Sequence, residues 1–166
     1  MLAKTYRLER TQFIPRPRDE VFGFFADAAN LQAITPPWLH FRIVTPQPIR
    51  IAAGTLIDYQ LRLFAVPIHW RTRIEQFDPP RQFVDAQLSG PYALWHHTHE
   101  FHEAPGGTQM IDRVDYRIPL GPLGRLAHAL FVRRLLKRIF DFRQETIDRM
   151  LRSPSRTNAA EVRFAE

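Results

Sequence analysis

The sequence contains no cysteine, and its 166 residues include only 7 glycines. The absence of cysteine excludes disulfide bonds, thiolate metal sites and cysteine nucleophiles, and it favours a reducing compartment. No apolar run approaches the roughly 18 residues that a membrane-spanning helix needs, and the first residues lack the apolar stretch of a signal peptide. We therefore expect a soluble, cytoplasmic protein without integral membrane association.

Two catalytic signatures are also missing. Ser89-Gly90 lacks the preceding glycine of a nucleophile elbow, so no Ser-His-Asp site can be built. The glycines at 106–107 and 121–124 are not followed by the Lys-Ser pair of a phosphate-binding loop. Nucleotide hydrolysis therefore has no support.

The composition is that of a folded chain: 45% of the residues are hydrophobic, and 13 of them are Phe. A chain of this length can bury roughly two-thirds of its unfolded surface, which is enough for one core. The 14 prolines fall mostly between periodic segments, so they punctuate elements and do not form a linker. We predict one domain over residues 1–152, followed by a polar tail over residues 153–166.

The order of the predicted elements is distinctive. One strand, Lys4–Ile14, precedes two short helices over residues 19–26 and 28–34, and a meander of strands then leads to a long helix that ends near Arg152. A meander of this length can curl around one long helix, which predicts an α+β helix-grip fold with an antiparallel sheet of about seven strands. The strands after the short helices are expected at His40–Thr45, Thr55–Phe64, Pro67–Phe77, Gln82–Ser89, Ala93–Glu103 and Thr108–Ile118.

The C-terminal segment is amphipathic and basic. Residues 123–152 carry eight basic and three acidic side chains, which is nearly all of the net charge of +6. A basic helix face is usually solvated, and the apolar stripe is needed to cover the sheet, so we expect no nucleic-acid partner; a regulatory partner of this face is a third alternative. The predicted stripe consists of His128, Phe131, Val132, Leu135, Ile139, Phe142, Thr146 and Met150.

The stretch Trp95-His-His-Thr-His-Glu-Phe101 carries the most chemical information. Strand alternation places His97 and His99 on one face between two large aromatics, which is unlike an ordinary apolar core. If Pro105-Gly106 forms a two-residue turn, His99 lies opposite Asp112 on the next strand.

Pairing the other hairpins by their turns extends this inward face. A turn over residues 64–67 pairs Tyr59 with Thr72, and the next hairpin pairs Ile74 with Asp85 and Gln76 with Phe83. Asp85 then lies opposite His97. The polar and aromatic side chains expected to face inward are Tyr59, Trp70, Thr72, Asp85, Gln87, Trp95, His97, His99, Asp112 and Tyr116, and Arg143 on the border of the helix stripe is expected to turn toward them.

A buried carboxylate that lacks a partner costs several kcal/mol, so the pairs Asp85 with His97 and Asp112 with His99 are the predicted arrangement. Such pairs can orient a ligand oxygen or act as general acid and base, and they can also do no more than satisfy each other. Two histidines and a carboxylate could also hold a metal ion, but each ring has its own carboxylate, so we assign no metal.

The chain resembles the SRPBCC, or START-like, superfamily over residues 4–152, and within it a bacterial subgroup labelled cell-division-inhibitor-like or polyketide-cyclase-like. The likeness depends on the element order and on short motifs, namely Asn30-Leu31, Ile34-Thr-Pro-Pro-Trp-Leu39, Gly90-Pro91-Tyr92 with Trp95, His97, His99 and Phe101, and Asp112 with Val114, Tyr116 and Pro119. The resemblance implies a ligand cavity between the sheet and the last helix, with no metal or other cofactor.

Beside a regulatory role of the basic helix face, the predicted cavity is compatible with two functions. The first is the binding of an apolar or aromatic small molecule, lipid-like molecules included, that enters between the loop 36–39 and the segment 119–124. The alternative is an enzyme of the cyclase, dehydratase or hydrolase type, in which His97 or His99 is the acid or base and Asp85 or Asp112 orients it. No oligomeric state follows from the sequence.

Overall fold

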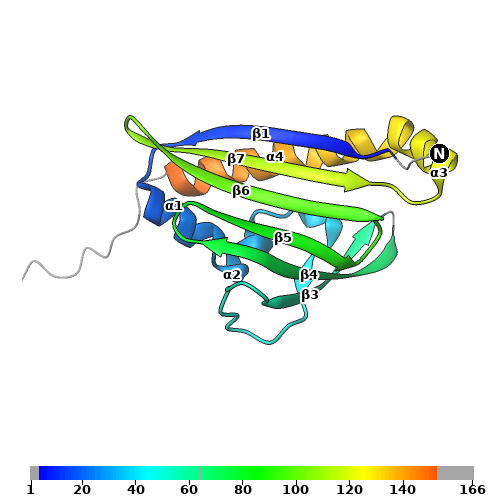
Figure 1. The fold of residues 1–166 in the computed structure, drawn as a ribbon, viewed down its shortest axis with the longest axis horizontal. Coiled ribbons are helices and arrows are strands. Elements are labelled where there is room, and N and C mark those ends of the chain that lie inside the picture. Colours follow the sequence, from blue (N-terminus) through cyan, green and yellow to red (C-terminus); the bar gives the residue numbers. More distant parts are fainter. Residues whose placement is uncertain (1–3, 64, 153–166) are drawn as a thin grey trace, which may run out of the picture.

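The computed structural model describes residues 4–63 and 65–152, so the predicted tail lies outside the described residues. Seven strands form one antiparallel sheet in the order β1-β7-β6-β5-β4-β3-β2 (Figure 1). The last strand therefore pairs with the first. The strands are β1 (Tyr6–Ile14), β2 (Arg42–Ile43), β3 (Leu56–Leu63), β4 (Val66–Asp78), β5 (Gln82–Ser89), β6 (Leu94–Ala104) and β7 (Gly107–Arg117).

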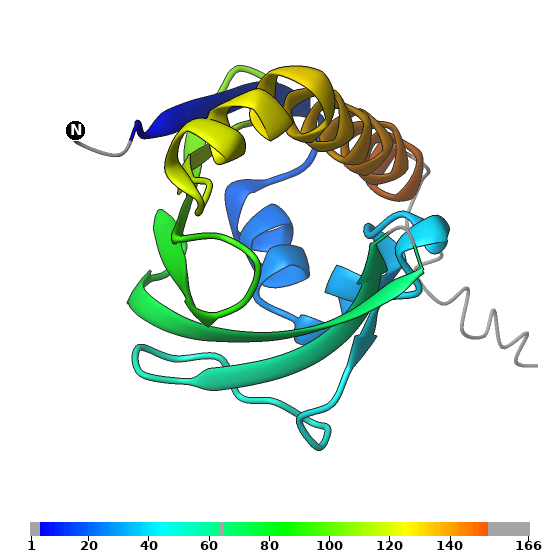
Figure 2. The same ribbon diagram turned by 90° about the vertical axis from the view of Figure 1, so that its right-hand side faces the viewer.

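The helices cover the concave face of the sheet. α4 (Arg133–Arg152) runs along this face, and the sheet curves from β1 beside the helix to β3 and β4 opposite it (Figure 2). α1 (Arg18–Phe25), α2 (Ala28–Ala33) and the 3-10 turn η1 (Pro37–Leu39) follow β1, and the Asp27 carboxylate caps α2 by accepting a hydrogen bond from the Ala29 amide. α3 (Gly121–Ala127) and the π-helical turn η2 (His128–Val132) lead into α4. This confirms the predicted helix-grip fold.

The central hairpins have the predicted register. His99 faces Asp112 because the β6–β7 turn contains only Pro105 and Gly106, and Asp85 on β5 faces His97 on β6. Gly106 has a φ of +80°, a conformation that glycine adopts without steric cost.

Two predicted pairings are wrong. The β3–β4 turn is tighter than expected, so Tyr59 pairs with Trp70 in place of Thr72. A bulge in β4 between Ile74 and Gln76 places Gln76 opposite Val84 and not opposite Phe83. The first offset amounts to two residues on one strand, so it leaves every side chain on its predicted face.

The predicted helix stripe is correct in part: His128 and Thr146 are buried and Leu135 and Ile139 line the cavity, but the centre of the buried stripe lies one residue further along α4. Phe131 is 60% exposed and Met150 is 40% exposed, although both were expected to face the sheet. A π-helical turn holds more residues than an α-helical turn, so η2 rotates the rest of the helix relative to a uniform 3.6-residue period. The side chains that α4 buries are Leu136, Phe140, Arg143, Thr146, Ile147 and Leu151.

Two glycines are expected to respond oppositely to alanine. A Cβ at Gly107 would lie 2.2 Å from the backbone oxygen of Ile14, whereas a Cβ at Gly23 in α1 would meet nothing within 4 Å. Gly107→Ala should lower the free energy of unfolding by about 1–3 kcal/mol. Gly23→Ala should raise it by roughly 0.5–1 kcal/mol, because alanine favours the helix. Urea denaturation measures both, and equal effects would contradict the assigned backbone contact.

Candidate functional site

A cavity of about 210 Å³ lies between the sheet and α4. Its walls come from β3 to β6, from α1, α2 and η1, and from α4. Eight of the predicted inward residues line it, and most other lining residues are aliphatic or aromatic. The eight are Tyr59, Trp70, Thr72, Asp85, Trp95, His97, His99 and Arg143.

Three predicted site residues do not line this cavity. Gln87 lies on β5, and its side chain donates a 2.7 Å hydrogen bond to the backbone oxygen of Tyr92 in the β5–β6 turn. The hydroxyl oxygen of Tyr116 lies 2.8 Å from His128 Nε2. Asp112 contacts the two histidines on the side away from the cavity. All three were expected on the inward face, but they support the wall and do not form its surface.

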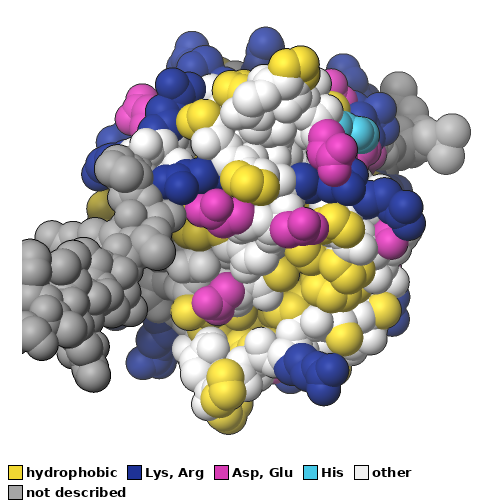
Figure 3. Space-filling view, turned by 90° about the vertical axis from the view of Figure 1, so that its left-hand side faces the viewer, with side chains coloured by type: hydrophobic (Ala, Val, Ile, Leu, Met, Phe, Trp, Pro, Cys, Tyr) yellow, Lys and Arg dark blue, Asp and Glu magenta, His cyan; other side chains and the backbone are white. Residues whose placement is uncertain are grey.

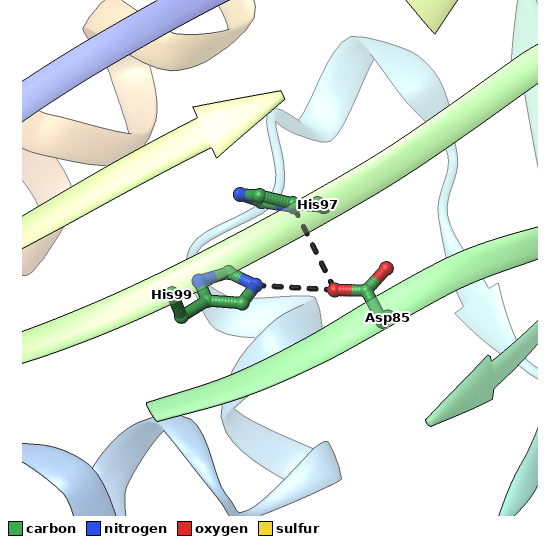
Figure 4. Close-up of side chains that lie close together, drawn as sticks. All are labelled: Asp85, His97 and His99. Carbon is green, nitrogen blue, oxygen red and sulfur yellow. Dashed lines mark hydrogen bonds and ion pairs between the residues drawn. The ribbon is translucent and has the colours of Figure 1, made fainter. Parts of the chain in front are cut away.

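The two histidines and two carboxylates form a closed cluster, which we call the His-Asp quartet: Asp85, His97, His99 and Asp112. His97 Nε2 is 3.1 Å from Asp112 Oδ1, and His99 Nε2 is 3.1 Å from Asp85 Oδ2. The hydrogen-bonded pairs are therefore the reverse of the predicted ones. Figure 4 shows that both rings reach from β6 toward the same Asp85 oxygen on β5.

Each ring in fact contacts both carboxylates. His97 Nδ1 lies 3.7 Å from Asp85 Oδ2, and His99 Nδ1 lies 2.6 Å from Asp112 Oδ1. The predicted separation into two independent pairs is wrong because the rings are neighbours on one strand face, with centroids only 3.8 Å apart.

Arg143 completes the charge balance of the quartet. It is buried as predicted, with Nε 3.5 Å from Asp112 Oδ2 and its guanidinium 5.5 Å from the centre of the Phe25 ring. Burial opposes ionisation of Asp112, but Arg143 and the two imidazoles outweigh burial and hold the pKa of that carboxyl well below its usual range. Asp112 therefore remains a carboxylate.

The two imidazoles differ in their affinity for a proton. Burial lowers the pKa of His97, and the nearby charge of His99 lowers it further. Burial also opposes protonation of His99, but contact with both carboxylates raises its pKa overall. Burial disfavours the charge on Asp85 as well, yet its bond to His99 keeps the pKa of this carboxyl lowered. With His97 neutral and His99 protonated, the quartet and Arg143 together carry no net charge.

Hydroxyl and indole groups form a second polar region of the cavity wall. Tyr59 donates a short hydrogen bond to Thr72 Oγ1, and Trp70 Nε1 donates to the same oxygen at 3.1 Å. Burial raises the pKa of Tyr59, and the charge of Asp85 adds to this effect. Tyr59 therefore stays a neutral hydrogen-bonding group.

Several lining residues were not predicted, because they lie outside the strands whose alternation gave the inward face. The first two helices contribute an apolar series with helical spacing, and that spacing was the available signal for it. Leu39 from the predicted entrance loop lines the cavity, but residues 119–124 are not among the lining residues. The helical and loop residues that were missed include Phe24, Phe25, Leu31, Ile34, Phe41, Tyr92 and Leu136.

Tyr116 and His128 give a prediction for acid stability. Burial lowers the pKa of His128, and the charges of Arg133 and Lys4 lower it further. The unfolded chain, with an imidazole pKa near 6.5, thus binds the proton more tightly, so stability present above about pH 6.5 is lost as the pH falls. We expect the free energy of unfolding to fall less between pH 7 and 5 in His128→Gln. Equal slopes in urea titrations would contradict this.

Comparisons with known proteins place this architecture in a class. A seven-stranded antiparallel sheet around a long C-terminal helix, with a cavity between them, is the SRPBCC helix-grip class predicted from the sequence. A family model described as polyketide cyclase/dehydrase and lipid transport matches residues 5–150. The chain belongs to this family.

Solved structures share the fold at low sequence identity. The ZhuI aromatase/cyclase from Streptomyces sp. R1128 is 16% identical, with a TM-score of 0.70 over 90% of this chain and 94% of that chain. TTHA0849 from Thermus thermophilus is 17% identical, with a TM-score of 0.67 over 90% of this chain and 99% of that chain. A nucleoside-diphosphate sugar epimerase from Corynebacterium glutamicum is 25% identical, with a TM-score of 0.65 over 87% of this chain and 29% of that chain. The search of curated proteins found no match.

Surface features add little to the site. In the described residues, no helix is both long and apolar enough to cross a membrane. The face seen in Figure 3 carries acidic and basic side chains side by side. On the basic face of α4, Lys137 forms a 2.6 Å ion pair with Asp141, and the Arg138 guanidinium lies 4.5 Å from the Trp38 ring centre. Part of this basic face is thus engaged within the protein.

Proposed function

We propose that this protein binds an apolar or aromatic small molecule that carries an oxygen group, in the cavity between the sheet and α4. The observation that carries the proposal is the contrast between apolar and polar side chains within one cavity. Apolar and aromatic side chains form most of the wall, while Asp85, His97 and His99 are gathered at one position on it. An apolar body would occupy the first region, and an oxygen would be oriented by the second.

The size of the cavity limits the ligand. An engineered apolar cavity of about 150 Å³ in another protein accepts benzene, and drug-sized ligands occupy roughly 300–1,000 Å³. The volume here, about 210 Å³, falls between these values. A molecule of one or two rings, or a short chain, suits this space. The family description, which includes lipid transport, supports an apolar ligand. A cytoplasmic location is part of the same proposal.

Calorimetry with probes of matched size tests the proposal. Titration of the full chain with 2-naphthol, which combines an apolar bicycle with one hydroxyl, should show saturable binding at one site. Glucose, which is polar throughout, should not bind. Native mass spectrometry of gently purified protein should also detect a co-purifying small molecule. If 2-naphthol produces no saturable heat and no small molecule co-purifies, the proposed binding function is wrong.

A second candidate function is general acid–base catalysis of the cyclase or dehydratase type. The observation that favours it is a buried imidazole, His97, whose lowered pKa keeps it neutral while it lines the cavity. A neutral imidazole beside a bound carbonyl compound can remove a proton from the adjacent carbon. Deuterium exchange at the α-carbon of 2-tetralone, followed by NMR, should then be accelerated by the protein and not by His97→Gln. Equal rates for both proteins would exclude this role.

A further inference from the structure

Three potential metal ligands converge on the cavity wall. One ligand atom from each of Asp85, His97 and His99 lies within 4.8 Å of the other two. The Asp85 oxygen Oδ2 is 3.1 Å from His99 Nε2 and 3.7 Å from His97 Nδ1 (Figure 4). Ligands at 2.0–2.1 Å from a tetrahedral zinc ion are separated by about 3.4 Å, so the two separations bracket the value that such an ion imposes.

The remaining imidazole nitrogens face a second carboxylate. His97 Nε2 and His99 Nδ1 lie 3.1 Å and 2.6 Å from the same Asp112 oxygen. Arg143 in turn holds the other oxygen of Asp112. Metal-binding histidines characteristically direct their second nitrogen to a carboxylate, which fixes the ring and raises its basicity as a ligand.

Hydrogen bonds within the cluster do not satisfy every side-chain atom that faces Asp85. When neutral His97 donates its Nε2 proton to Asp112, its Nδ1 presents a lone pair toward Asp85 Oδ2. Two acceptors then face each other across 3.7 Å. A cation between the two rings and Asp85 would engage the facing lone pairs.

We propose that Asp85, His97 and His99 bind a divalent transition metal ion such as Zn²⁺, with Asp112 and Arg143 as the supporting layer. Imidazole nitrogens select such ions over Mg²⁺ and Ca²⁺, which prefer oxygen ligands alone. The expectation of no metal assumed one carboxylate for each ring, whereas here both rings share both carboxylates.

The site leaves a coordination position open to the ligand. The three ligand residues line the cavity, while Asp112 lies behind them. This inference rests on the proposed function and deepens it. A divalent ion, two carboxylates, Arg143 and two neutral imidazoles leave one positive charge, so the preferred ligand would present an anionic or readily ionised oxygen, such as a phenolate or carboxylate, on an apolar body.

Cobalt binding tests the site in the full chain. After chelator treatment, one equivalent of Co²⁺ at pH 7.5 should produce the intense visible absorption of four- or five-coordinate cobalt. Asp85→Asn and His99→Gln should abolish this spectrum. The variant that replaces both His96 and His102, which lie on the opposite face of β6, with Ala should retain it. Asp112→Asn should weaken binding by about 10–100-fold, the usual effect of losing a supporting carboxylate.

Two results would each refute the proposal, and the first needs only the wild-type chain. If folded protein binds no stoichiometric Co²⁺, or if the His96/His102 variant loses the spectrum while Asp85→Asn keeps it, the assignment is wrong, whether or not other variants fold. Titration of metal-free protein with 2-naphthol separates the two hypotheses. Binding of 2-naphthol without Co²⁺ binding refutes only the metal site, and Co²⁺ binding without any 2-naphthol affinity refutes the ligand function.

Discussion

Replacing Asp112 with asparagine is expected to lower the free energy of unfolding by about 3–5 kcal/mol, the usual cost of removing one member of a buried ion pair. Asp112 is buried, and its carboxylate contacts His97, His99 and Arg143. An amide preserves the shape but removes the negative charge, so the buried guanidinium loses its nearest anion. Urea denaturation at pH 7 followed by circular dichroism measures the change.

A double-mutant cycle shows whether the loss arises from the charge of Arg143. Arg143→Met combined with Asp112→Asn should cost less than the sum of the two single changes, because each single change leaves the other charge unbalanced. The matched control is Asp141→Asn on the same helix as Arg143. Asp141 pairs with Lys137 and with Arg10, but its own side chain is 35% exposed, so a change of about 1 kcal/mol is expected. Strict additivity, or an equal loss in the control, would contradict the balanced-charge interpretation.

Strand alternation was sufficient to predict most of the polar strand residues that line the cavity. A strand alternates with a period of two, so a register error of two residues between β3 and β4 still placed Tyr59 and Thr72 on the cavity wall. The short β6–β7 turn fixed His99 opposite Asp112 without any ambiguity. Alternation and turn length therefore predict the faces of a meander better than its exact pairing.

The sequence could not predict how the inward side chains share contacts. The reversal of the hydrogen-bonded pairs depends on the rotamers of His97 and His99, which stand side by side on β6 and can each reach two neighbouring strands. The phase of α4 depends on the π-helical turn η2, for which apolar periodicity carries no clear signal. Both errors concern side-chain rotamers and helix geometry, which hydrophobic periodicity does not encode.

Replacing Leu61 with tryptophan is expected to reduce the affinity for 2-naphthol by about 100-fold, or roughly 2.8 kcal/mol. Leu61 lies on β3, pairs with Ile68 and lines the cavity, so an indole at this position would occupy space that the ligand needs. The side chain would extend into existing open volume, and the stability should therefore change by less than the roughly 1–3 kcal/mol that overpacking of a filled core costs. Calorimetry gives the affinity.

Leu88→Trp is the matched control, because Leu88 on β5 is 49% exposed and is not among the cavity-lining residues. It should bind 2-naphthol as the unmodified protein does. Equal loss in both variants would mean that the probe binds to the surface, and unchanged affinity in Leu61→Trp would mean that it binds elsewhere. A selective loss would locate the ligand in the cavity beside the His-Asp quartet, because the indole at position 61 removes volume there without altering any charged group.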